Sequence, residues 1–150
     1  MTNNKLADAI AFATVAHKHC REKNGDPYIL HPIRVMDSVK APEEKMTAIL
    51  HDVVEDTAVT LDDLRAEGFP EAVVEAVGLL SRDPDNKEPG YYDLYIERIG
   101  GNTIARRVKL ADLTDNMNIT RLPTLREKDV RRLEKYCRVW LRLSAIEADS

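Results

Sequence analysis

An imidazole and three carboxylates are concentrated in the short stretch LHDVVEDT at residues 50–57. If the helix predicted before this stretch continues through Asp56, then His51 and Glu55 lie one turn apart, and Asp52 and Asp56 form a second pair with the same spacing. About 100° of rotation separates the two pairs, so all four groups lie over one patch. A buried carboxylate needs a partner or a cation. The spacing alone leaves two interpretations open, a solvated acidic helix end or part of a metal site.

The adjacent His51 and Asp52 favour the second interpretation, because an imidazole beside a carboxylate suits a divalent metal. A complete site needs a distant histidine and a distant aspartate. The candidates are His31, which precedes a proline, and Asp112, in the sequence LAD at residues 110–112. Each also has an ordinary explanation: His31 as a helix cap or a packed imidazole, and Asp112 as the partner of Lys109 or of an arginine.

The composition is that of a globular protein, with 150 residues, 43% of them hydrophobic and 32% charged. We predict a single domain spanning residues 1–150. The net charge of −4 argues against nonspecific binding to nucleic acid. We expect no membrane association and a cytoplasmic location, because no signal peptide and no membrane-length apolar run is evident. The two cysteines are far apart and are expected to be reduced.

Helical periodicity dominates the chain, and no alternation of strands and helices is evident. Helices are predicted at residues 5–20, 33–39, 42–57, 60–67, 71–80, 91–99, 103–116 and 125–148. The polar segment at residues 81–90 is predicted to be a mobile loop. The fold class is therefore predicted to be all-α, a bundle of about seven or eight helices.

Several charged and aromatic residues have no assigned chemistry. His17 and His19, near the end of the first helix, are expected to have surface or structural roles. The tyrosines at residues 91–95 are core residues or pocket-lining residues. The basic residues of the last helix are interpreted as a solvated face, and they include Arg126, Lys128, Arg131 and Arg132.

The order His31, His51-Asp52, Asp112 resembles the metal-binding pattern of HD-domain phosphohydrolases. Longer motifs make the resemblance more specific. They are GxPYIxHP at residues 25–32, LHDVVEDT at residues 50–57, KLAD at residues 109–112 and the Asn116-Met117 pair. Together these motifs resemble the hydrolase domain of the RelA/SpoT alarmone proteins and their stand-alone small hydrolases. The resemblance covers about residues 9–122 and implies an HD-type helical bundle.

The resemblance implies metal-dependent removal of the 3′-pyrophosphate from ppGpp or pppGpp, a small nucleotide, most often with Mn²⁺. Glu55 and Asp56 would orient or deprotonate the attacking water, and the choice between them as main base stays open. Lys23 and Tyr28 would lie near the nucleobase, and Asn116 near the ribose or a phosphate. The implied metal ligands are His31, His51, Asp52 and Asp112. Formation of a homo-oligomer is left open.

The chain departs from the family pattern in the region expected to hold the nucleotide. Glu22 stands where the family commonly has an arginine, and residues 19–20 and 118–119 also differ. The predicted metal ligands are unaffected, so the departures concern the identity of the substrate. Two alternatives therefore remain: a phosphohydrolase acting on another nucleotide, and a noncatalytic nucleotide-binding module. The second is disfavoured because Glu55 and Asp56 accompany the full ligand set.

Overall fold

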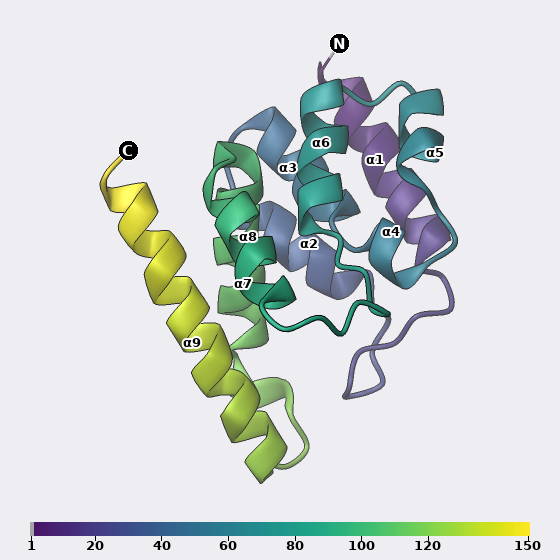
Figure 1. The fold of residues 1–150 in the computed structure, drawn as a ribbon. Coiled ribbons are helices and arrows are strands. Elements are labelled where there is room, and N and C mark those ends of the chain that lie inside the picture. Colours follow the sequence, from purple (N-terminus) through teal and green to yellow (C-terminus); the bar gives the residue numbers. More distant parts are fainter. Residues whose placement is uncertain (1) are drawn as a thin grey trace.

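The computed structural model describes residues 2–150, with side chains from Lys5 onward, and it is built of helices (Figure 1). The helices are α1 (Thr2–Ala16), α2 (Leu30–Asp37), α3 (Pro42–Leu50), α4 (Val53–Asp56), α5 (Leu61–Ala66), α6 (Glu71–Leu80), α7 (Tyr91–Gly100), α8 (Thr103–Asn116) and α9 (Glu127–Ala148), with a 3₁₀ turn η1 (Ile119–Arg121). Between residues 2 and 150 the only β-type pairing is an isolated bridge between Arg21 and Pro27. The predicted all-α class is confirmed.

Local sequence signals set several helix starts. At α5, Thr60 Oγ1 accepts a hydrogen bond from the Asp63 N–H at 3.1 Å, and the Asp63 carboxylate accepts one from the Thr60 N–H at 2.9 Å. At α8, the Asn102 side chain accepts a hydrogen bond from the Ala105 N–H at 2.9 Å. Before α7, Gly90 has a φ of +83°, a left-handed conformation that glycine adopts without strain.

The single long helix predicted at residues 42–57 is wrong. The chain leaves the helix after Leu50, turns at His51 and Asp52, and forms the single turn α4. Nδ1 of His51 lies 2.6 Å from the carbonyl oxygen of Ala48, the group that a continuing helix would pair with the Asp52 N–H. Asp52 has φ −106° and ψ −1°, away from the helical values. The histidine ring thus takes a backbone acceptor and ends α3.

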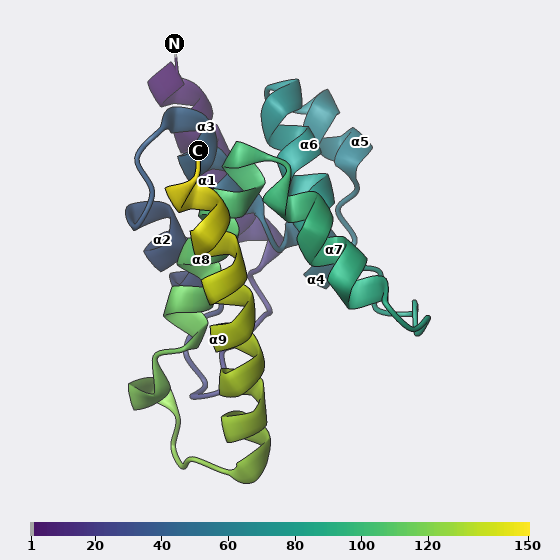
Figure 2. The same cartoon turned by 60° about the vertical axis from the view of Figure 1, so that its left-hand side comes forward.

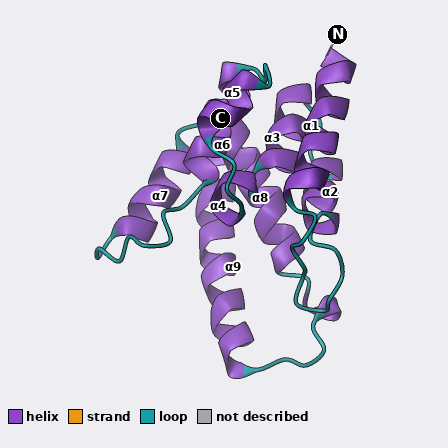
Figure 3. Cartoon of the chain, turned by 90° about the vertical axis from the view of Figure 1, so that its right-hand side faces the viewer, coloured by secondary structure: helices purple, strands orange, loops and turns teal. Residues whose placement is uncertain are grey.

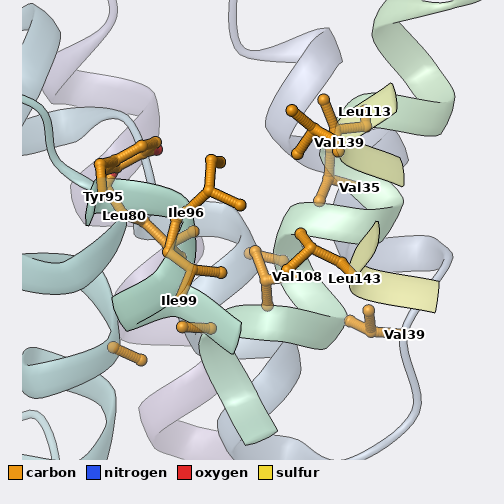
Figure 4. Packing of buried hydrophobic residues seen from close by; sticks show 13 residues of the cluster. Val35, Val39, Leu80, Tyr95, Ile96, Ile99, Val108, Leu113, Val139 and Leu143 are labelled. Carbon is orange, nitrogen blue, oxygen red and sulfur yellow. The ribbon is translucent and has the colours of Figure 1, made fainter. Parts of the chain in front are cut away.

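Two hydrophobic cores share α3 and α6. The first core joins α1, α3, α4, α5 and α6 and comprises Ala9, Ala13, Met46, Ile49, Leu50, Val53, Leu64, Phe69, Val73, Val74 and Val77. The second core joins α2, α3, α6, α7, α8 and α9. Its larger members are Val35, Val39, Leu80, Tyr95, Ile96, Ile99, Val108, Leu113, Val139 and Leu143 (Figure 4). Helices α3 and α6 therefore connect the two halves of the bundle.

Helix α9 runs along the outside of the bundle beside α7 and α8 (Figures 1 and 2). Val139 and Leu143 anchor it in the second core, and its first turns extend past the other helices. The α1–α2 loop and the α8–α9 connection lie at the same end of the molecule as these turns (Figure 3). None of the helices within residues 2–150 is both long enough and apolar enough for a membrane crossing.

Candidate metal centre

The four predicted ligands come from three separate places in the fold. His31 lies in the first turn of α2, His51 and Asp52 form the turn between α3 and α4, and Asp112 lies in α8. One donor atom from each of His31, His51 and Asp52 lies within 4.8 Å of the others. Oδ1 of Asp112 lies 3.0 Å from Nε2 of His31 and 3.5 Å from Nε2 of His51. The structure thus brings all four residues together.

Both imidazoles point Nε2 into the shared space because Nδ1 is engaged elsewhere. Nδ1 of His51 faces the Ala48 carbonyl at 2.6 Å, and Nδ1 of His31 faces Oδ2 of Asp115 at 2.6 Å. A carbonyl oxygen can only accept, so Nδ1 of His51 carries a proton, and Nε2 is the nitrogen whose lone pair is available to a metal ion when the ring is neutral. Within the described part of the chain, this buried Nε2 has no hydrogen-bond partner.

The donor set fits a divalent metal ion. Two imidazole nitrogens and two carboxylates are the ligand types that such ions accept, and buried carboxylates need a compensating positive charge. The two carboxylates favour a positive charge between them. Burial lowers the pKa of His51, but Asp52 and Asp112 outweigh burial and raise that pKa well above its ordinary value. The buried Nε2 of His51 lies beside these carboxylates without a hydrogen-bond partner, and this is the observation that most directly fits a metal ion.

Hydrogen bonds and a buried lysine hold both aspartates in their ionised form. Burial opposes ionisation of Asp52, but His51 and the O–H of Tyr28, which donates to Oδ2, lower its pKa to about 2. Burial also opposes ionisation of Asp112, yet Lys109, 3.0 Å from its Oδ2, keeps that pKa well below its usual range. The expected pair of Asp112 with Lys109 is therefore present beside the imidazoles and does not replace them.

Glu55 and Asp56 lie in α4, one turn beyond the aspartate of the cluster, and they have different surroundings. Oε1 of Glu55 accepts a hydrogen bond from the backbone N–H of Arg82 at 2.6 Å and lies 3.4 Å from its Nε. No side chain among residues 5–150 is hydrogen-bonded to the Asp56 carboxylate. Burial and repulsion from Asp52 and Glu55 raise the pKa of Asp56 to about 6. Asp56 is thus the carboxylate better suited to exchange a proton near neutral pH.

Two adjoining cavities open over the cluster. The second, of about 340 Å³, contains His51, Asp52, Asp112, Glu55 and Asp56 in its wall. The first, of about 280 Å³, lies between the α1–α2 loop, η1 and α9. The three predicted substrate residues line the first cavity, namely Lys23, Tyr28 and Asn116. Tyr28 and Asn116 line both cavities, so the two cavities adjoin at these side chains.

Arg132, which the sequence places on a solvated face, has a side chain that is 37% exposed and that also lines both cavities. Lys135, one turn further along α9, also lines the second cavity, with Nζ 3.7 Å from the centre of the Tyr92 ring. Tyr92 and Tyr95 both line this cavity, and Tyr95 is also a core residue whose O–H donates to the Leu80 carbonyl at 2.9 Å. Four cations in all line the second cavity: Arg82, Lys109, Arg132 and Lys135.

Sequence reasoning also missed two groups next to the cluster. His17 is buried with its ring 5.0 Å from that of Tyr28, which agrees with a structural role, and burial lowers its pKa. Asp115, which contacts His31, is not among the site residues predicted from the sequence. Burial opposes its ionisation, but hydrogen bonds from His31 and Arg34 lower its pKa to about 2. Its position one turn after Asp112 was the available signal, since residues three apart share a helix face.

Comparison with known proteins supports the predicted relationship. No family model matches the chain. The chain is 33% identical over 131 residues to the guanosine-3′,5′-bis(diphosphate) 3′-pyrophosphohydrolase of Haemophilus influenzae, covering 80% of this chain and 19% of that protein. It is 32% identical over 142 residues to the bifunctional (p)ppGpp synthase/hydrolase SpoT of Escherichia coli K12, covering 87% of this chain and 20% of that protein. The chain therefore spans about a fifth of the length of these curated relatives.

A solved structure of a metazoan ortholog of SpoT, described as hydrolysing ppGpp and acting in starvation responses, has the same fold. The TM-score is 0.75 at 24% sequence identity, and the match covers 97% of this chain and 94% of the other. In sequence and in fold, the chain resembles the hydrolase domain of the RelA/SpoT-type proteins.

Proposed function

We propose that the chain is a metal-dependent hydrolase that removes the 3′-pyrophosphate of ppGpp or pppGpp. One observation carries this proposal: two imidazoles and two carboxylates converge at the floor of a cleft that also holds two further acids and four cations. Such a cleft suits a highly charged phosphate ester. The names of the curated relatives indicate which ester it is.

His31, His51, Asp52 and Asp112 would hold a divalent ion. Mn²⁺ is our choice because the resemblance to the alarmone hydrolases implies it. When bound, such an ion lowers the pKa of water and neutralises charge on the attacked phosphate. The O–H of Tyr28 and the ammonium group of Lys109 keep the two aspartates ionised and oriented toward it.

Asp56 would accept the proton of the attacking water. Its carboxylate lines the second cavity, and its raised pKa matches proton transfer near neutral pH. Glu55 has a different task, because its Oε1 accepts a hydrogen bond from the Arg82 backbone. It would hold the start of the 81–90 loop so that the Arg82 side chain stays at the cavity wall.

The nucleotide would lie across both cavities. The first cavity, with Lys23, Tyr28 and Asn116 in its wall, would take the nucleoside and its 5′ phosphates. The second would take the 3′-pyrophosphate, whose charge is complementary to Arg82 and Lys135 in its wall. Products of this arrangement are GDP or GTP and inorganic pyrophosphate.

A second candidate function is hydrolysis of a different nucleotide, and one observation favours it. Glu22 lines the first cavity where the family commonly has an arginine, and its carboxylate is paired with Arg34 at 2.5 Å. Exchange of a guanidinium for a neutralised carboxylate removes a planar cation from the nucleoside site and alters base recognition.

The test is release of pyrophosphate from ppGpp by purified protein with Mn²⁺. Asp52→Ala is the inactive variant, and Asp62→Ala, an exposed aspartate on α5, is the matched control. Turnover that is lost with Asp52→Ala and kept with Asp62→Ala supports the proposal. Failure on ppGpp with metal-dependent turnover of another nucleotide in a panel would refute it in favour of the second candidate.

A further inference from the structure

Asp115 contacts the side of His31 that faces away from the metal cluster. Its Oδ2 lies 2.6 Å from Nδ1 of His31, while Nε2 of the same ring faces Asp112. Arg34 fixes this carboxylate with two donors, Nε to Oδ1 at 2.8 Å and Nη2 to Oδ2 at 3.1 Å. Arg121 supplies the third arginine donor to this carboxylate: its Nη2 donates to Oδ2 at 3.1 Å and also to the Asp115 backbone carbonyl at 2.7 Å.

The same arginine reaches the α1–α2 loop. Nη2 of Arg34 donates to Oε1 of Glu22 at 2.5 Å, and the Glu22 side chain is only 13% exposed. Glu22 and Arg121 both line the first cavity, in which the nucleoside is proposed to bind. A continuous path of charge-assisted hydrogen bonds therefore leads from the cavity wall through Arg34 and Asp115 to His31. We name Glu22, Arg34 and Asp115 the Glu22–Arg34–Asp115 network.

A ligating histidine binds the metal through one ring nitrogen, and a carboxylate at the other ring nitrogen fixes the tautomer and the orientation of the ring. The carboxylate accepts a hydrogen bond from Nδ1–H, which fixes the tautomer in which Nε2 carries the lone pair for the metal, and it makes Nε2 a better electron-pair donor. His51 obtains its orientation from the backbone carbonyl of Ala48 instead. The orientation of His31 depends on other side chains. Substitution of those side chains can therefore alter the orientation of His31 without a change to the backbone.

We propose that Asp115 is a positioning residue that orients His31 for metal binding, and that Arg34 and Glu22 hold Asp115 in place and couple the α1–α2 loop to the metal centre. This inference rests on the metal centre of the proposed function. It assigns to Glu22 a structural task, the fixing of Arg34, in the place where a nucleotide contact was expected.

The test measures Mn²⁺ affinity in the absence of nucleotide, by electron paramagnetic resonance of free Mn²⁺ or by calorimetry. Asp115→Asn keeps the size of the side chain and removes its charge, and it should weaken Mn²⁺ binding about 10- to 100-fold. Arg34→Met should weaken binding in the same direction, and Arg34→Lys should restore part of the loss because it keeps the charge without the two-donor contact. Arg65→Met is the matched control, since Arg65 also bridges two carboxylates, Asp62 and Glu71, on the distant α5.

A double-mutant cycle tests the link to the loop. Glu22→Gln should weaken Mn²⁺ binding in the wild-type background and have no further effect in the Arg34→Met background. Circular dichroism melting accompanies each measurement, and Arg34→Met carries the test if Asp115→Asn fails to fold. Folded variants at Asp115 and Arg34 that bind Mn²⁺ within about twofold of wild type would overturn the proposal.

The outcomes separate this inference from the proposed function. Protein whose Mn²⁺ affinity depends on the network but which leaves ppGpp intact would refute the proposed activity and support the positioning role. Wild-type protein that does not bind Mn²⁺ or another divalent ion would refute the metal centre, and the positioning role with it.

Discussion

Replacement of Asp56 by asparagine should make the metal-free protein more stable while it removes hydrolytic activity. Folding raises the pKa of this carboxyl from 3.8 to about 6, first through burial and then through repulsion from Asp52 and Glu55. An acid whose pKa rises on folding stabilises the protein only when protonated. The folded state therefore loses stability as the pH rises from 3.8 through about 6.

The size of the effect follows from the shift. About two pKa units correspond to about 3 kcal/mol without screening. The Asp56 side chain is partly in water, so screening reduces the gain from Asp56→Asn to about 1 kcal/mol. For a chain of this size, that gain raises the melting temperature by about 2–4 °C.

The assay is urea or thermal unfolding of Asp56→Asn and wild type with a chelator present, at about pH 5 and about pH 7. The gain should be larger at the higher pH. Asp85→Asn, an exposed aspartate in the 81–90 loop, is the control and should show no pH-dependent gain. An Asp56→Asn protein that is no more stable than wild type near neutral pH would refute the reasoning that burial and neighbouring charges act against this carboxylate.

Three further predictions concern the core, the cleft and the metal. Leu143→Ala empties a fully buried site between α9 and the second core and should cost about 2–5 kcal/mol in urea unfolding, whereas a loss below about 1 kcal/mol would mean that α9 is not anchored there. Tyr28→Phe removes the hydroxyl that donates to Asp52 and should lower pyrophosphate release about tenfold, and unchanged turnover would contradict a role for this hydrogen bond. Mn²⁺ at a hundred times its dissociation constant should stabilise the wild type by about 2.7 kcal/mol, and a similar gain in Asp112→Ala would place the ion elsewhere.

Most helices of the fold could be predicted from the sequence, because apolar periodicity and, at some helix starts, capping residues are local signals. Thr60 and Asp63 cap α5, and Asn102 caps α8, as local patterns indicate. The break at His51 could not be predicted in this way. It depends on a side chain that takes the Ala48 carbonyl from the backbone, and helical spacing is unaffected by that choice.

The convergence of the four cluster residues could be predicted from their types and order and from the family pattern that they resemble, but the groups that surround them could not. Spacing indicates that Arg132 and Lys135 share a face of α9, yet it does not indicate which part of the bundle that face meets. The contact between Asp115 and His31 joins residues 84 positions apart. Such a contact appears only when α2 and α8 are packed together, so it depends on tertiary structure.

The two cores also differ in when their residues become available during synthesis of the chain. Every residue of the first core lies between Ala9 and Val77, and both histidines of the cluster and Asp52 are made within the same interval. Asp112 follows about 35 residues later, a delay of about 2–7 s at typical translation rates. A nascent chain thus presents two imidazoles and one carboxylate before α8 supplies the second carboxylate and Lys109. Emergence of α8 from the ribosome is therefore the step that completes the donor set, and it separates early folding of the first half from loading of the metal.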